Sequence, residues 1–217
     1  MKFDISGNPE YGDLTVALAP GESVWAESGA MSRMSTHLEL KSHIIGGAMQ
    51  GLARKFLGGE SLFIAEYTAP DTGFVSLSPS SPGCVLHREL QGDTFNLTSG
   101  SFLACAPGMN VRPRWGGWKA LFSGEGLVVL EVSGNGDLFY NAFGAVVEHE
   151  LNGTLTVDTG HVVAWEPTLE YSIGGMGGLK QTMFSGEGLV MKFSGHVKLW
   201  TQTRHLKALA GWLTPYL

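Results

Sequence analysis

The feature that most constrains this chain is a short motif, Gly-Glu-(Ser/Gly)-Leu, that occurs three times. The copies are Gly59–Leu62, Gly124–Leu127 and Gly186–Leu189, and each opens a run of apolar residues. Their first glycines lie 65 and then 62 residues apart. A period of that length suits a small unit of several strands. The chain is therefore predicted to be an internal triplication.

A second repeated pattern supports the same register. Three segments share a glycine, an apolar stretch, a turn and a further apolar residue, and these are Gly21–Met31, Gly100–Met109 and Gly160–Leu169. Apolar stretches bounded by turn residues are typical of strands. We therefore expect a strand, a turn and a second strand at the same place in each copy.

The first copy is longer than the other two. From the upstream glycine to the glycine of the motif there are 38 residues in the first copy, against 24 and 26 in the others. The extra length falls near Ile44–Leu57, a segment rich in glycine and alanine. Its length suits one short helix or a glycine-rich loop.

The predicted fold class is all-β: three repeated units of β-sandwich or double-stranded β-helix type in one body. The chain is treated as a single domain over 1–217, with repeats at about 1–78, 79–142 and 143–202. Strands are expected at Leu14–Leu18, Phe74–Leu77, Cys84–Leu90, Gly126–Val132 and His196–Thr201. One helix is expected, at about 203–213, with Thr203 as its N-cap and Leu206, Leu209, Trp212 and Leu213 near one face.

Composition limits the classes of partner and compartment. The net charge is −6, which argues against a broad phosphate-binding surface. No stretch approaches eighteen apolar residues, and no secretory signal is recognised at the start. The two cysteines, Cys84 and Cys105, have no metal-binding spacing and are predicted to be buried free thiols. The expected location is the cytoplasm, where thiols stay reduced.

No catalytic or metal-binding motif was found. The seven histidines form no His-x-His or His-Glu-x-x-His pair, so no metal site is predicted. Ser61 lacks the closing glycine of a nucleophile elbow. The sequence therefore predicts a protein that is not an enzyme and that carries no cofactor.

The repeated motif places one carboxylate in each copy: Glu60, Glu125 and Glu187. Each could accept backbone N–H groups within a turn, which is the simpler interpretation. Alternatively, a threefold arrangement could bring the three carboxylates together around a cation or small ligand.

One segment concentrates positive charge and tryptophan. Asn110–Lys119 contains Arg112, Arg114, Trp115, Trp118 and Lys119. Such a cluster could stack on nucleic-acid bases or hold an acidic partner. Packing of the indoles at a subunit interface is the favoured interpretation.

Two further apolar surfaces are candidates for contact with a partner. Phe56 and Leu57 lie in the predicted insertion, and Trp212 lies in the predicted helix. Contact with another subunit or with the β-body is favoured over contact with lipid, because exposed apolar patches more often mark protein interfaces.

Taken together, these motifs resemble the AIM24 family. The resemblance rests on the triplicated motif, the opening Gly21–Met31, the segment Phe56–Leu62 and the stretch Val111–Arg114, and it covers almost the whole chain. That family comprises uncharacterised bacterial and archaeal proteins and a mitochondrial relative linked to inner-membrane organisation. The resemblance implies a fold similar to the tryptophan-RNA-binding attenuation protein, assembled as a homo-oligomer, and it implies no catalytic residues.

The expected function is therefore that of a non-enzymatic scaffold or interaction protein that forms a ring-like or trimeric homo-oligomer. A peripheral position at a membrane, or a protein partner, is compatible with it. One alternative is a module that binds a small ligand or cation through the repeated glutamates. Another is nucleic-acid binding through Arg112–Lys119. The negative net charge makes nucleic acid an unlikely partner.

Overall fold

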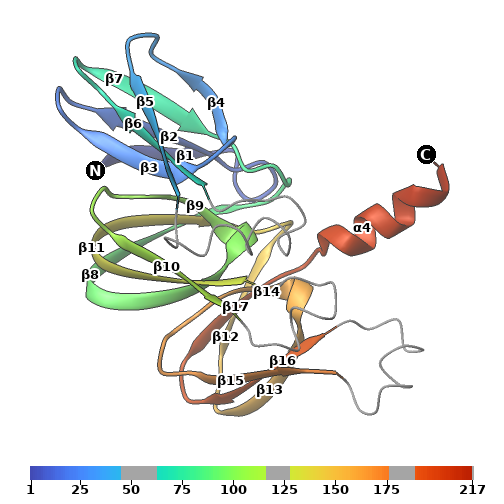
Figure 1. Ribbon diagram of the computed structural model, residues 1–217. Coiled ribbons are helices and arrows are strands. Elements are labelled where there is room, and N and C mark those ends of the chain that lie inside the picture. The colour runs from blue at the N-terminus through green and yellow to red at the C-terminus, as the bar shows by residue number, and fades with distance from the viewer. Residues whose placement is uncertain (45–62, 116–127, 176–188, 217) are drawn as a thin grey trace.

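The computed structural model describes residues 1–44, 63–115, 128–175 and 189–216. Almost every regular element in these ranges is a strand, which confirms the all-β prediction (Figure 1). The likeness to the tryptophan-RNA-binding attenuation protein and the repeat boundaries stay predictions.

The strands lie in three stretches of the chain, and every pairing between named strands in the described residues is antiparallel. The first stretch contains β1 (Lys2–Ser6), β2 (Asp13–Leu18), β3 (Ser23–Glu27), β4 (Met31–Met34), β5 (Glu39–Ile44), β6 (Phe63–Thr68) and β7 (Gly73–Leu77). The second contains β8 (Val85–Thr98), η2 (Ser99–Ser101), β9 (Phe102–Cys105), β10 (Asn110–Trp115) and β11 (Val128–Asn141). The third contains β12 (Val146–Glu150), β13 (Gly153–Asp158), η3 (Thr159–His161), β14 (Val162–Trp165), β15 (Glu170–Gly174), β16 (Val190–Gly195) and β17 (Lys198–Gln202).

One large sheet runs through all three stretches. Its order is β12-β17-β14-β8-β11-β9-β3-β6-β5, with β10 added beside β11. Two smaller sheets, β1-β2-β7-β4 and β13-β16-β15, flank it at opposite ends of the molecule (Figure 1). Because strands of the first, second and third stretches pair within one sheet, the thirds of the chain are joined by backbone hydrogen bonds as well as by side chains.

The middle of the molecule is built on two long strands. β8 and β11 pair along nearly their whole length, and the register shifts between Ser133 and Asn135. Gly134 lies in this shift with a φ of 129°, a value that residues with a Cβ rarely adopt. The glycine therefore permits the bulge that bends the pair.

The core of the described residues consists of three apolar clusters, each centred on one stretch and completed by residues of a neighbouring stretch. Phe95, Leu130 and Trp200 belong to the central cluster, Leu14 belongs to the first, and Trp165 belongs to the third. The short strands β9 and β14 are buried along their whole length, as central strands covered on both faces should be.

The repeated motifs fall at matching places in the topology. The copies directly precede β6, β11 and β16, and these strands form the antiparallel pairs β5·β6, β10·β11 and β15·β16. The upstream pattern is confirmed as strand, turn, strand, because β3, β9 and β14 are followed by β4, β10 and β15. Of the predicted insertion, Ile44–Leu57, the first residue ends β5 and residues 45–57 lie outside the described residues.

The C-terminal helix forms, but three residues later than predicted. α4 spans Leu206–Leu213, with His205 at its N-cap, and a 3-10 turn, η4 (Thr214–Tyr216), follows it. The prediction that Thr203 caps the helix was wrong. Its hydroxyl oxygen accepts a hydrogen bond from the backbone N–H of Ala145 at 3.1 Å, and its own N–H donates to the Ala145 carbonyl. These bonds hold Thr203 to the β-body, so the helix begins only beyond it.

Candidate functional site

The described residues contain a pocket of about 300 Å³ between the turns η2 and η3. The end of β3 contributes Glu27, and the start of α4 contributes His205 and Leu206. All three thirds of the chain therefore meet at this pocket.

The pocket wall contains a buried amide with an unmatched oxygen. Asn141, at the end of β11, is only 4% exposed, and its Nδ2 donates to the carbonyl of Gly100 at 3.4 Å. Its Oδ1 has no hydrogen-bond partner among the described residues. A buried acceptor of this kind normally has a partner, so water or a bound polar group is expected there.

A set of side chains suited to a metal ion lies beside the pocket. Asp158, His161 and His205 each offer one ligand atom, and these atoms all lie within 4.8 Å of one another. All three side chains are half-buried. Asp158 is the N-cap of the turn η3 and His161 is its last residue, whereas His205 comes from the segment that joins β17 to α4.

Backbone hydrogen bonds position the first two side chains. Asp158 Oδ1 accepts a hydrogen bond from the N–H of Gly160 at 2.8 Å, which caps η3. His161 Nδ1 lies 2.8 Å from the carbonyl oxygen of Gln202, so this ring nitrogen must carry the proton that is donated. In the neutral imidazole the other ring nitrogen, Nε2, then carries the lone pair.

Gln202 fixes the spacing between η3 and β17. Its Nε2 donates to the carbonyl of Gly160 at 2.8 Å, and its Oε1 accepts from the N–H of Phe143 at 2.8 Å. Gln202 thus bonds to two residues of η3, to Gly160 through its side chain and to His161 through its backbone carbonyl. The end of β17, and the His205 that follows it, are held against η3 as a result.

The third side chain packs directly on a glycine. A Cβ added at Gly160 would come within 2.2 Å of the Nε2 and Cδ2 atoms of His205. The His205 ring therefore occupies the space that any larger residue at position 160 would fill. The rings of His161 and His205 lie 5.6 Å apart, centroid to centroid.

This cluster was missed by the sequence analysis, which predicted no metal site. The two histidines are 44 positions apart, and only the pairing of β14 with β17 brings them together. The Asp158 and His161 pair at i and i+3 is too common a spacing to have indicated a site. All seven histidines lie in the described residues, and only these two take part in the cluster.

Several predicted site residues lie outside the described residues. These are Phe56, Leu57, Glu60, Trp118, Lys119, Glu125 and Glu187. The alternative of a carboxylate site formed by the three repeated glutamates therefore stays a prediction.

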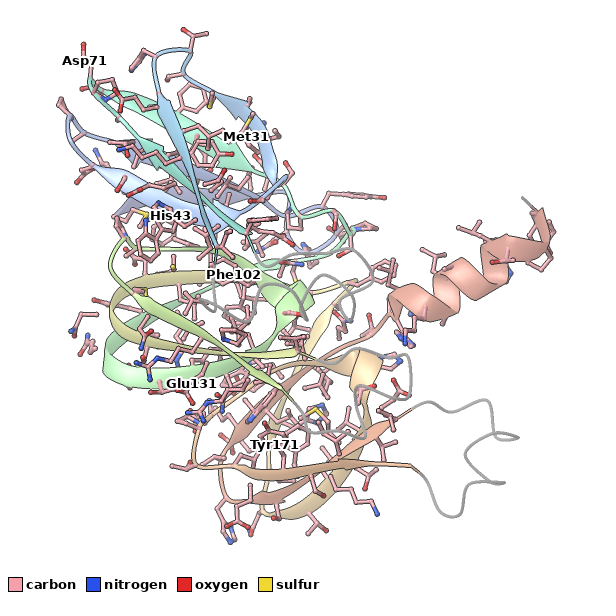
Figure 2. All side chains as sticks on the ribbon, viewed as in Figure 1. Met31, His43, Asp71, Phe102, Glu131 and Tyr171 are labelled. Carbon is pink, nitrogen blue, oxygen red and sulfur yellow. The ribbon has the colours of Figure 1, made fainter. Side chains whose placement is uncertain are left out.

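Both described arginines of the basic segment have hydrogen-bond partners, and Arg114 is also ion-paired. Arg114 on β10 pairs with Glu131 on β11 through N–O distances of 2.9 and 3.1 Å (Figure 2 labels Glu131). The hydrogen bond and the charge of Glu131 raise the pKa of Arg114. Arg112 donates from Nε to Asn110 Oδ1 at 3.1 Å, and Trp115 ends β10 opposite Val128. Glu131 thus offsets part of the positive charge that a nucleic acid would need.

Trp212 lies on an exposed apolar helix. In the described structure no side chain of α4 is buried, and Trp212 is 64% exposed. Its ring contacts only the nearby Tyr216 among the described aromatic rings, with centroids 5.7 Å apart. Figure 2 shows the helix and its side chains standing clear of the β-body. Of the two contacts favoured for this helix over lipid, burial against its own β-body is not seen in the described structure, and contact with another subunit stays a prediction.

The cysteines behave as predicted. Cys84 and Cys105 are both free and buried, and burial raises the pKa of the Cys105 thiol to about 12. A thiol with such a pKa stays protonated near neutral pH and is a poor nucleophile. Across the described ranges, no helix is both long enough and apolar enough to cross a bilayer.

Comparisons with known proteins agree with the motifs. A family profile described as "Mitochondrial biogenesis AIM24" matches residues 3–204. An uncharacterised protein of Streptococcus pyogenes serotype M6 is 33% identical over 226 residues, which covers 100% of this chain and 91% of that protein. A crystal structure of a Streptococcus pyogenes protein superposes with a TM-score of 0.84 at 31% identity, covering 100% of this chain and 99% of the other. The chain therefore belongs to the AIM24 family.

Proposed function

We propose that this protein is a non-enzymatic interaction protein that associates with further copies of itself, and that α4 is the element through which it docks. The observation that carries this proposal is the exposure of α4. Leu206 and Trp212 are 62% and 64% exposed, and Leu209 and Leu213 are more than one third exposed. A contiguous apolar surface of this kind usually marks a contact site.

The position of α4 suits a helix that packs on a second copy of the chain. The helix follows Arg204, whose N–H donates to the Phe143 carbonyl, and it then projects away from the β-body (Figure 1). An arm without a buried side chain can bury its apolar face on another copy, and the exchange can be reciprocal around a twofold axis.

Charge favours another copy over a membrane as the occupant. Between Leu206 and Tyr216 the chain has one charged residue, Lys207. Helices that lie on anionic membranes combine their apolar face with several lysines or arginines. The whole chain carries a net charge of −6, which would further oppose attraction to such a surface. Two buried free thiols, Cys84 and Cys105, support a reducing compartment such as the cytoplasm.

The test is light scattering after size exclusion, over a range of protein concentrations. We expect the wild type to form a defined oligomer and the double variant Leu209→Glu/Trp212→Glu to be monomeric. Tyr11→Ser is the matched control, because Tyr11 is an aromatic residue that is 75% exposed far from α4 in the sequence. The control should keep the wild-type mass.

Two results would overturn the proposal. One is a monomeric wild type at every concentration, and the other is a double variant with an unchanged oligomer. Sedimentation of a monomeric wild type with phosphatidylglycerol vesicles, lost in the double variant, would make lipid the occupant instead of a second copy.

A further inference from the structure

We propose that Asp158, His161 and His205 form a binding site for a divalent transition-metal ion of the zinc type. Two imidazoles and one carboxylate are the ligands that zinc commonly takes in proteins, with a fourth position left to water or to a bound molecule. This inference goes beyond the proposed function and does not depend on it.

The distances in the cluster are compatible with such an ion. Zinc bonds to nitrogen and oxygen are about 2.0–2.2 Å long, which places tetrahedral ligand atoms about 3.5 Å apart. The three ligand atoms lie within 4.8 Å of one another. Side-chain shifts of about 1 Å would therefore close the site around an ion, and the half-buried positions leave room for them.

The hydrogen bond of His161 selects the tautomer of the neutral ring that a ligand needs. Its Nδ1–H is donated to the backbone carbonyl of Gln202, so Nε2 carries the lone pair. Histidines that bind metals very often donate their second ring nitrogen to a carbonyl or carboxylate in this way. Asp158 is prepared similarly, because the Gly160 N–H holds Oδ1 and leaves Oδ2 for an ion.

The third ligand would couple the ion to α4. His205 is the N-cap residue of the helix, and its ring fits against the bare Cα of Gly160. An ion bridging His205 to the two ligands of η3 would therefore fix the start of α4 to the β-body. The direction in which the helix projects would then depend on the metal.

The fourth coordination position of the ion would open toward the pocket. His205 and Gly160 line the pocket between η2 and η3, and so does Asn141, whose buried Oδ1 has no partner among the described residues. A metal-bound water or small polar ligand could enter there and supply the hydrogen bond that Asn141 lacks among the described residues.

The first test is zinc binding to untagged protein stripped with a chelator, measured by competition with a chromophoric zinc indicator. We expect one saturable site in the wild type. Removing one ligand in His161→Ala or His205→Ala should weaken binding by about 100-fold or more, since changes in outer ligand partners alone cost about 10–100-fold. His196→Ala is the control, because His196 is an exposed histidine outside the cluster, and it should bind as the wild type does.

Two further variants separate a lost ligand from a damaged fold. Asp158→Asn keeps a side-chain oxygen that can cap η3 but removes the negative charge, so it should weaken zinc binding by about tenfold while the circular dichroism stays unchanged. Gly160→Ala keeps all three ligands, but its methyl group would displace the His205 ring, so it should also weaken binding strongly. Gly100→Ala is its match in η2, where an added Cβ meets nothing within 4 Å, and should have no effect.

The site would be confirmed independently by Co²⁺, which should give the visible absorption of a tetrahedral site in the wild type and lose it in His205→Ala. The proposal is overturned if the wild type shows no saturable zinc binding. It is equally overturned if His161→Ala and His205→Ala bind zinc as tightly as the His196→Ala control.

Discussion

The turns η2 and η3 have nearly the same backbone and very different side chains. The residues before them have φ and ψ of −70° and 146° at Thr98, and of −59° and 135° at Asp158. The residues after them have −75° and 128° at Phe102, and −79° and 128° at Val162. Each turn leads into a fully buried strand, β9 or β14. One backbone design is thus present in two copies.

The side chains put this shared backbone to different uses. In η2 the hydroxyls of Thr98 and Ser101 bond to each other at 2.9 Å, and Thr98 also donates to the carbonyl of Val162 at 3.0 Å. In η3 the same two positions hold Asp158 and His161, which belong to the candidate metal site. The turn η2 therefore joins the second stretch of the chain to the third, whereas η3 presents candidate metal ligands.

The largest expected effect comes from the ends of the strands that follow the turns. Trp165 ends β14 with no exposed surface and packs on Tyr171 and Phe193, with ring centroids 5.2 and 5.6 Å away. We expect Trp165→Ala to lower the free energy of unfolding by about 3–5 kcal/mol, because a large cavity would remain. Urea denaturation measures this.

Cys105 holds the matching position at the end of β9, and it is also fully buried. Cys105→Ala removes one sulfur atom and should lower the free energy of unfolding by much less than Trp165→Ala. Equal losses from the two variants would show that the ends of β9 and β14 contribute equally to packing.

A smaller effect is expected from the bond that joins the two turns. Thr98→Val keeps the shape of the side chain and removes the hydroxyl that reaches Val162, and should therefore lower the free energy of unfolding by about 1–2 kcal/mol. Thr98→Ser restores the hydroxyl and should recover most of the loss. If Thr98→Val and Thr98→Ser are equally stable in urea, the hydroxyl does not join the turns.

The sequence predicts the short strands β2 and β7 well because their signals are local, but it predicts less than half of the long strands β8 (Val85–Thr98) and β11 (Val128–Asn141). β2 and β7 lie within one residue of the predicted Leu14–Leu18 and Phe74–Leu77, where β-branched and aromatic residues are dense. The helix was also found from its periodicity, although its start was not, since Thr203 is held by Ala145. That contact spans 58 residues of chain and has no local signature.

The candidate metal site could not be predicted because it depends on a contact between distant segments. Nothing near His205 indicates that it lies against Gly160, since this follows from the antiparallel register that pairs Val162 with Thr201. A signal did exist in the repeats. The aligned glycines Gly100 and Gly160 are flanked by serines in one copy and by Thr159 and His161 in the other. A difference between copies of a repeat can point to a site where a spacing motif cannot.

The smallest effect on the free energy of unfolding is expected from replacing the two turn glycines, Gly100 and Gly160, by alanine in the absence of metal. Neither Gly100 nor Gly160 has a left-handed φ, so alanine fits both backbones. At Gly100 the new methyl group meets nothing within 4 Å, and Gly100→Ala should raise the free energy of unfolding by about 0.5 kcal/mol through the loss of freedom in the unfolded chain.

At Gly160 the same gain is opposed by the displacement of the His205 ring. In chelator, we therefore expect Gly160→Ala to be less stable than Gly100→Ala by about 1 kcal/mol or less, as for other changes to half-exposed contacts. The comparison can be made in the same urea titration. Equal stabilities would mean that the His205 ring leaves η3 at no cost when no ion holds it. The packing of His205 on Gly160 would then depend on the metal, and the difference between the two turns would be one of ligand binding alone.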